Sequence, residues 1–167
     1  MPKAYAYPLG QGKNGDPQQL LVYRMENEAL GHCGRVSLSR REIEGIVAAV
    51  CRNYGVRKAS CIWRPMRHAA EWQDTGYIYL SSTKSTSSHL VTITHELAHH
   101  IHHALSKGKD EDYEHHGPEF MACHMSILDT CRIVPADAMA VVCKRYGIKF
   151  KDPGIKGDMK QLARCLK

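Results

Sequence analysis

The chain has 167 residues, of which 43% are hydrophobic, and a formal net charge of +6. This size and composition suit one soluble globular domain with one core, and the longest apolar runs are far too short to cross a bilayer. Seven cysteines without a CxxC pair disfavour a disulfide framework and a zinc ribbon, and the start lacks a secretory pattern, so we expect a reducing, cytoplasmic setting.

Residues 1–34 predict a loop-rich N-terminal arm. Turn-forming glycines and Pro17 precede a short apolar run at 20–23, which we interpret as a strand. No function follows from this arm. The rest, 35–167, is expected to form the main domain and to end in a short basic tail.

The middle of the chain predicts one helix and two strands. Apolar residues recur at helical spacing over 40–53, where Ser37 or Ser39 can cap the helix and Gly55 can end it. Residues 59–63 resemble a short strand, and 76–81 form the clearest strand because they are rich in β-formers and bounded by Gly and Ser.

Three further helices are expected after a polar loop at 81–89. They cover about 88–105, 118–131 and 135–146, with a charged loop at 107–114 between the first two. A short helix over 158–166 is expected in the tail. Strands followed by several helices indicate an α+β fold.

A metal-binding pattern lies within the first of these helices. His95 and His99 are four residues apart, so a helix places both imidazoles on one face, close enough to share one ion. This is the HExxH arrangement of zinc proteases. Glu96 lies about 100° further round the helix, where it can accept a proton from water activated by the metal and pass it on.

Catalytic zinc generally has three protein ligands, so a third must come from elsewhere. His102 and His103 are too far along the helix, roughly 10 to 12 Å from His95, and His100 faces away. Both His115 and His116 follow the charged loop and remain candidates. We favour His116 because it starts the sequence HGPEF, in which Gly and Pro can turn the chain into the next helix.

Glu119 lies one turn further on, and we consider two alternative roles for it. It either orients a metal ligand through a hydrogen bond or stabilises the N-terminus of the helix through its negative charge. A different interpretation of the whole pattern is metal storage or transport, since eight of the eleven histidines fall within 95–124. The position of Glu96, the apolar helix and a separate histidine on a turn favour a catalytic site instead.

HELAH at 95–99, an acidic loop and HGPEF at 116–120 resemble the SprT-like (Spartan-type) zinc metalloproteases. The sequence WRPM at 63–66 and the strand at 76–81 extend this resemblance over about 57–130. The resemblance implies a compact α+β zincin core with a small mixed sheet packed on the HExxH helix. It implies His95, His99 and His116 as Zn2+ ligands and Glu96 as general base.

The resemblance also implies that the strand at 77–81 lies along the cleft and binds an extended substrate by strand addition. Tyr77, Tyr79 and Ser81 are the expected substrate contacts. The family is best known for cleaving proteins bound or crosslinked to DNA. This chain departs from the common family pattern in having no CxxC pair after the core, which leaves the DNA-linked role less supported than the peptidase chemistry.

Two basic segments bear on that role. Residues 35–67 and 144–167 each carry eight Lys or Arg against two acidic residues, whereas 68–143 carry four against ten. Such segments are either ordinary solvated surface or a contact surface for DNA. The competing functions are a non-catalytic zinc- or DNA-binding protein and a general or cell-wall-directed zinc peptidase.

Overall fold

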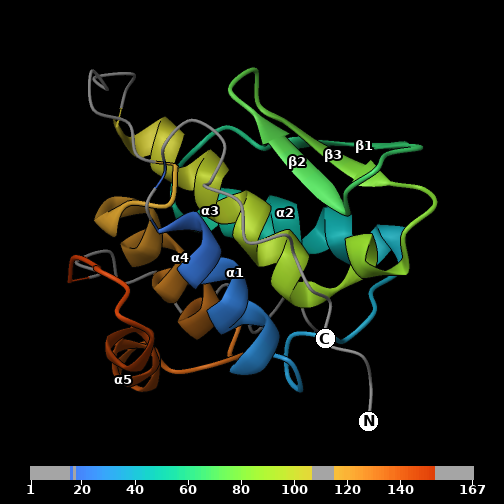
Figure 1. Cartoon of the computed structure of the whole chain (residues 1–167). Helices are drawn as coiled ribbons and strands as arrows, with labels where there is room; N and C mark the ends of the chain where they lie inside the picture. The colour runs from blue at the N-terminus through green and yellow to red at the C-terminus, as the bar shows by residue number, and fades with distance from the viewer. Residues whose placement is uncertain (1–15, 17, 107–114, 153–167) are drawn as a thin grey trace, which may run out of the picture.

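The computed structural model describes residues 16, 18–106 and 115–152 (Figure 1). Within these residues it has five α-helices, a three-stranded sheet and a short 3-10 helix, which confirms the expected α+β class. The elements are α1 (Gln19–Glu28), α2 (Arg40–Asn53), β1 (Ser60–Arg64), β2 (Ala70–Gln73), β3 (Tyr77–Ser81), η2 (Ser85–Ser88), α3 (Leu90–Ser106), α4 (Pro118–Thr130) and α5 (Ala136–Tyr146). The predicted loop at 107–114 and tail helix at 158–166 lie outside the described residues.

The four helices from α2 onward match the expected ranges closely, and local signals set their ends. Ser39 and Glu42 form a capping box at the start of α2, each side chain accepting the other residue's backbone N–H. Pro118 occupies the first turn of α4. Gly147 ends α5 in the left-handed conformation, with φ of 70°.

The first helix corrects the predicted strand at 20–23. These residues belong to α1, whose Val22 and Met25 are both fully buried. Their spacing of three residues places them on one side of a helix, and a short apolar run by itself does not distinguish a strand from a buried helix. Both side chains belong to the same hydrophobic core as those of α3 and α4, so the helical part of the predicted arm is integrated into the fold.

The sheet is mixed, as expected, but its strand order changes the predicted role of β3. The order is β1-β3-β2, with β1 parallel and β2 antiparallel to β3. Tyr77 already pairs with Ser60 on one side and Gln73 on the other. The prediction that a substrate adds as a strand to 77–81 is therefore wrong, because β3 is paired on both sides and has no free edge. The edges belong to β1 and to β2, a strand that was not predicted from the sequence.

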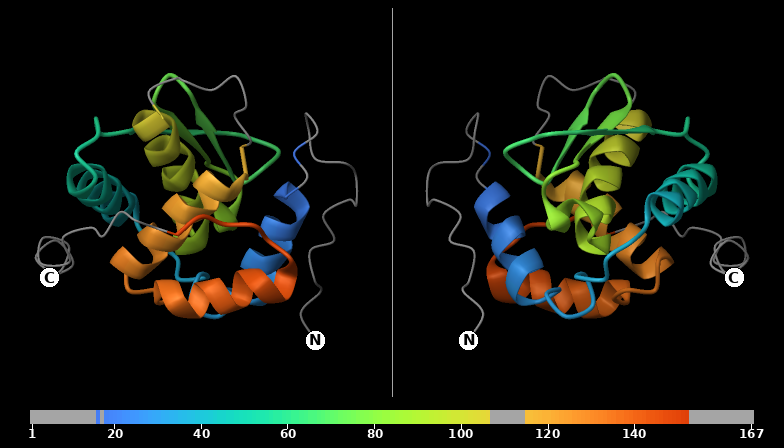
Figure 2. Two further views of the ribbon diagram at one scale, coloured as in Figure 1. Left: turned by 90° about the vertical axis from the view of Figure 1, so that its left-hand side faces the viewer. Right: turned by 90° about the vertical axis from the view of Figure 1, so that its right-hand side faces the viewer.

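Helix α3 lies in the middle of the molecule. It contacts β2, α2 and α4, with the sheet on one side and α4 on the opposite side, while α2 and α1 flank it (Figures 1 and 2). One core cluster includes side chains from all five helices and from the sheet. Among the described helices, none has both the length and the apolar character needed to cross a membrane.

Candidate metal centre

The HExxH residues lie on α3, at the centre of the fold. His95 and His99 are 5% and 7% exposed, and their Nε2 atoms are 3.2 Å apart. The side chains of α3 are buried without interruption from Ile93 to His102. Polar groups are rarely buried this deeply without a partner, so two facing imidazoles in this position need an explanation beyond packing.

His116 reaches the same point from the turn before α4. Its Nε2 atom is 3.2 Å from that of His95, and its side chain is also buried. His95, His99 and His116 each offer a ring nitrogen within 4.8 Å of the other two. Two nitrogens bound to one tetrahedral zinc at ~2.0–2.1 Å lie about 3.3 Å apart. The observed separations of 3.2 Å therefore fit a shared ion.

Two carboxylates hold the outer nitrogens of these rings. Glu26 Oε1 lies 2.6 Å from His95 Nδ1, and Asp16 Oδ2 lies 2.6 Å from His116 Nδ1. The pKa of Asp16 is lowered, so this carboxylate is ionised, can only accept, and requires His116 to donate from Nδ1–H. Burial raises the pKa of Glu26 to about 7, and the ionised form of Glu26 likewise requires His95 to donate from Nδ1–H. The Nε2 atoms of His95 and His116 then face each other as two lone pairs at 3.2 Å. A cation between them turns this repulsion into coordination.

Burial keeps the three imidazoles in the neutral form that binds metals. It lowers the pKa of His95 to about 3 and that of His99 well below its usual value. Burial also lowers the pKa of His116, although the hydrogen bond to Asp16 opposes this shift. His99 Nδ1, unlike its two counterparts, has no hydrogen-bond partner among the described residues.

A second group with ligand chemistry shares His95 and consists of Glu26, His95 and His124. The 2.6 Å between Glu26 Oε1 and His95 Nδ1 is a charge-assisted hydrogen bond. It is shorter than the separation of about 3.3 Å expected for two ligands of one tetrahedral ion. His124 Nδ1 lies 3.6 Å from the same oxygen. This group therefore supports the histidine cluster rather than forming a second ion site.

Glu96 lies where α3 meets β2. Its Oε2 atom accepts the backbone N–H of Trp72 at 2.7 Å, and its side chain is nearly buried. Burial raises the pKa of Glu96 to about 8, against the hydrogen bond from Trp72. The Trp72 ring stacks on His99, with centroids 5.9 Å apart, and the Phe120 ring lies 4.4 Å from that of His99. The His99 ring therefore lies between two aromatic side chains.

The structure distinguishes between His115 and His116, the two candidates for the third metal ligand. His115 is exposed, its ring centroid is 6.0 Å from that of His99, and it is not part of the cluster. Of the two roles predicted for Glu119, ligand orientation is not observed, because this carboxylate pairs with Lys151. Asp16 holds His116 instead.

The expected substrate contacts on β3 do not face the histidines. Ile78 and Leu80 are fully buried in the core that includes α3. Because side chains alternate along a strand, Tyr77 and Tyr79 lie on the opposite face, where Arg64 stacks on Tyr79 at 3.8 Å. Ser81 is buried and donates to the Met66 carbonyl. A role for these three residues in the predicted cleft is therefore not supported.

Asp16 and Glu26 were not among the residues predicted from the sequence. They lie 100 and 69 residues from the histidines that they contact, and no spacing rule links them. The only signal was composition, since residues 1–34 contain just three acidic residues, the third being Glu28.

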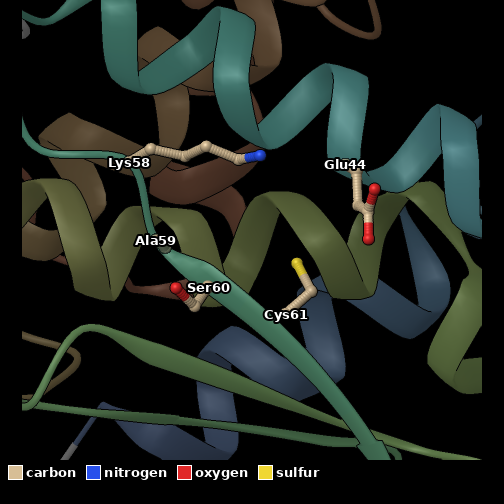
Figure 3. A pocket seen from close by; sticks show the side chains of 5 residues that line it. All are labelled: Glu44, Lys58, Ala59, Ser60 and Cys61. Carbon is tan, nitrogen blue, oxygen red and sulfur yellow. The ribbon is translucent and has the colours of Figure 1, made fainter.

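A hollow of about 260 Å³ lies elsewhere, between α2 and β1 (Figure 3). Glu44 and Cys61 point into it from the two elements. Burial raises the pKa of the Cys61 thiol to about 11, helped by Glu44 and opposed by Lys58. Because the thiolate is the nucleophile, a protonated Cys61 does not indicate a second catalytic site.

Residues 56–125 match the model of the Peptidase_M78 family, described as an IrrE N-terminal-like domain. This stretch, which includes α3 and His116, is thus similar to a metallopeptidase-type domain. Searches of curated proteins and of solved structures found no match to the chain. The match supports the metallopeptidase part of the resemblance, and its narrower SprT-like assignment stays a prediction.

Proposed function

We propose that this protein is a zinc-dependent peptidase of the SprT-like type. The observation that carries the proposal is the convergence of three buried Nε2 atoms on one point, with two of the rings fixed by carboxylates in the metal-binding tautomer. Neutral imidazoles in a group of three, without a fourth protein ligand among the described residues, favour a catalytic rather than a structural zinc site.

In this proposal His95, His99 and His116 hold the ion. When bound, zinc polarises the carbonyl of the bond to be cleaved and makes water a nucleophile at neutral pH. Glu96 takes the proton from that water and delivers it to the leaving amine. The backbone N–H of Trp72 holds the Glu96 carboxyl group in place. The positive charge of a bound ion would favour the ionised form of this group, which is the form that can accept a proton.

An extended substrate would pair with β2 rather than β3. β2 is an edge strand, and its Trp72 backbone contacts Glu96. A peptide added to this edge would run beside the catalytic carboxyl group, with its main chain held by strand hydrogen bonds.

The test is cleavage of an unfolded protein by Glu96→Gln, with zinc content measured in parallel. We expect a loss of about 10²–10⁴-fold in rate with zinc retained. Glu119→Gln is the matched control, since that glutamate is exposed and pairs with Lys151. Full activity in Glu96→Gln would refute the role of this residue. Tight zinc binding by a wild-type protein that cleaves nothing would indicate a non-catalytic module.

DNA-associated proteins are the substrate class that we propose within this activity. All eight Lys and Arg residues of 35–67 are exposed, whereas most of 144–167 lies outside the described residues. Phosphate contacts by such residues weaken steeply with salt. We expect DNA to stimulate cleavage at low salt and to lose this effect at high salt. Stimulation that is absent at every salt concentration would leave a general peptidase.

A further inference from the structure

We propose that Asp16 and Glu26 are part of the metal centre, as positioning residues that fix His116 and His95, and that the short segment carrying them (residues 16 and 18–26) docks on this centre. This inference rests on the metal-binding part of the proposed function and does not depend on catalysis. The segment lies outside the stretch similar to a metallopeptidase-type domain, which starts at residue 56.

Asp16 connects the start of α1 to the third histidine. Its Oδ2 atom accepts from both the backbone N–H and Nδ1–H of His116, at 2.9 and 2.6 Å. Its Oδ1 atom accepts the backbone N–H groups of Gln18 and Gln19, at 3.0 and 3.2 Å. Four donors thus surround one carboxylate. Burial raises the pKa of Asp16, but the hydrogen bonds from His116 and Gln18 lower it by more, so the pKa lies below its usual value.

Gln18 also binds the backbone of the turn that carries His116. Its buried amide donates to the His116 carbonyl at 2.9 Å and to the Lys149 carbonyl at 3.3 Å, and its oxygen accepts the Lys149 N–H. The backbone on both sides of the His116 ring is therefore held by residues 16 and 18. This matters because His116 lies on a turn and, unlike His95 and His99, has no helix to set its position.

Glu26 holds the other end of the cluster from the middle of α1. Its carboxylate is 11% exposed and binds His95 Nδ1 at 2.6 Å. Val22 and Met25 anchor the helix in the core. One short segment therefore positions two ligands that come from different elements.

A direct consequence is that metal binding and docking of this segment are coupled. If the docked segment strengthens metal binding, then bound metal must stabilise docking by the same free energy. Removing the metal should loosen α1 more than α5, the neighbouring helix, which contributes no residue to the histidine cluster.

The experiment measures zinc affinity of the full chain by competition with a chromophoric chelator. Asp16→Asn places an amide N–H₂ against backbone or ring donors, and Glu26→Gln keeps the shape but removes the charge. We expect each variant to bind zinc about 10–100-fold more weakly. Glu28→Gln is the matched control, because Glu28 lies on the same helix, is exposed, and pairs with Arg24; its affinity should equal that of wild type.

Hydrogen exchange with and without chelator supplies a second measurement. We expect faster exchange in 19–28 after zinc removal, with a smaller change in 136–146. Affinities of both carboxylate variants within twofold of wild type would overturn the inference, even if Asp16→Asn were also less stable. Wild-type protein that binds no zinc would instead refute the proposed function, so the two failures are distinguishable.

Discussion

The two regions that meet at the histidine cluster differ in how visible they are in the sequence. The stretch 56–125 supplies three imidazoles and Glu96 in a recognisable pattern and matches a family model. The segment 16–28 supplies two carboxylates with no pattern at all. Local sequence patterns therefore reveal the candidate ligands, whereas the groups that would orient them are found only where distant segments meet.

The largest effect should come from the imidazole side of this comparison. We expect His116→Ala to weaken zinc binding by more than ~100-fold, because it removes a proposed ligand. Changing a residue that only hydrogen-bonds to a ligand weakens binding by at most about that factor. His115→Ala should bind zinc like wild type. Chelator competition measures both, and the opposite pattern would place the third ligand at His115 and remove the reason for a role of Asp16.

A large pH effect is expected at Glu96. Its pKa is raised to about 8 in the metal-free fold, from an ordinary value of 4.5, so the folded state holds a proton that the unfolded state releases. The contribution of Glu96 to the free energy of unfolding is fully present below pH 4.5 and is lost as the pH rises towards 8. Glu96→Gln should therefore stabilise the metal-free protein by at most ~4 kcal/mol at pH 8 and by little at pH 4.5.

Urea unfolding in the presence of chelator checks this difference. Glu119→Gln provides the contrast, because the hydrogen bond with Lys151 lowers the pKa of that exposed carboxyl group. Equal stabilisation by Glu96→Gln at both pH values would mean that the proton of Glu96 is not involved.

A core truncation tests whether the two regions share one fold. Met25 in α1 and Leu97 in α3 are both fully buried in the same core. We expect each change to alanine to lower the free energy of unfolding by about 3 kcal/mol in a single transition. If Met25→Ala left global unfolding unchanged, the segment 16–28 would be an attached arm.

The smallest effect is expected away from the centre. Ser39→Ala removes the capping box of α2 and should lower the unfolding free energy by about 1 kcal/mol. Zinc affinity should not change, since α2 contributes no residue to the cluster. Weaker zinc binding in this variant would show that affinity follows general stability and would weaken the comparison between the two regions.

The helices from α2 onward could be predicted because caps and apolar periodicity act within a few residues. Two elements could not. The run at 20–23 is compatible with a strand or a buried helix, and only packing of Val22 and Met25 decides between them. β2 has a mixed sequence, AEWQ, with all four residues half-buried, so it acquires strand structure by pairing with β3.

By itself, the sequence determined the α+β class, the histidine pair on one helical face and the choice of a third histidine after the charged loop. Tertiary structure alone decided that β3 is central, that Tyr77 and Tyr79 face away from the histidines, and that Asp16 and Glu26 hold two of the rings. The reason is physical: helical geometry fixes neighbours three or four residues apart, whereas contacts across 69 and 100 residues exist only once the core has brought the segments together.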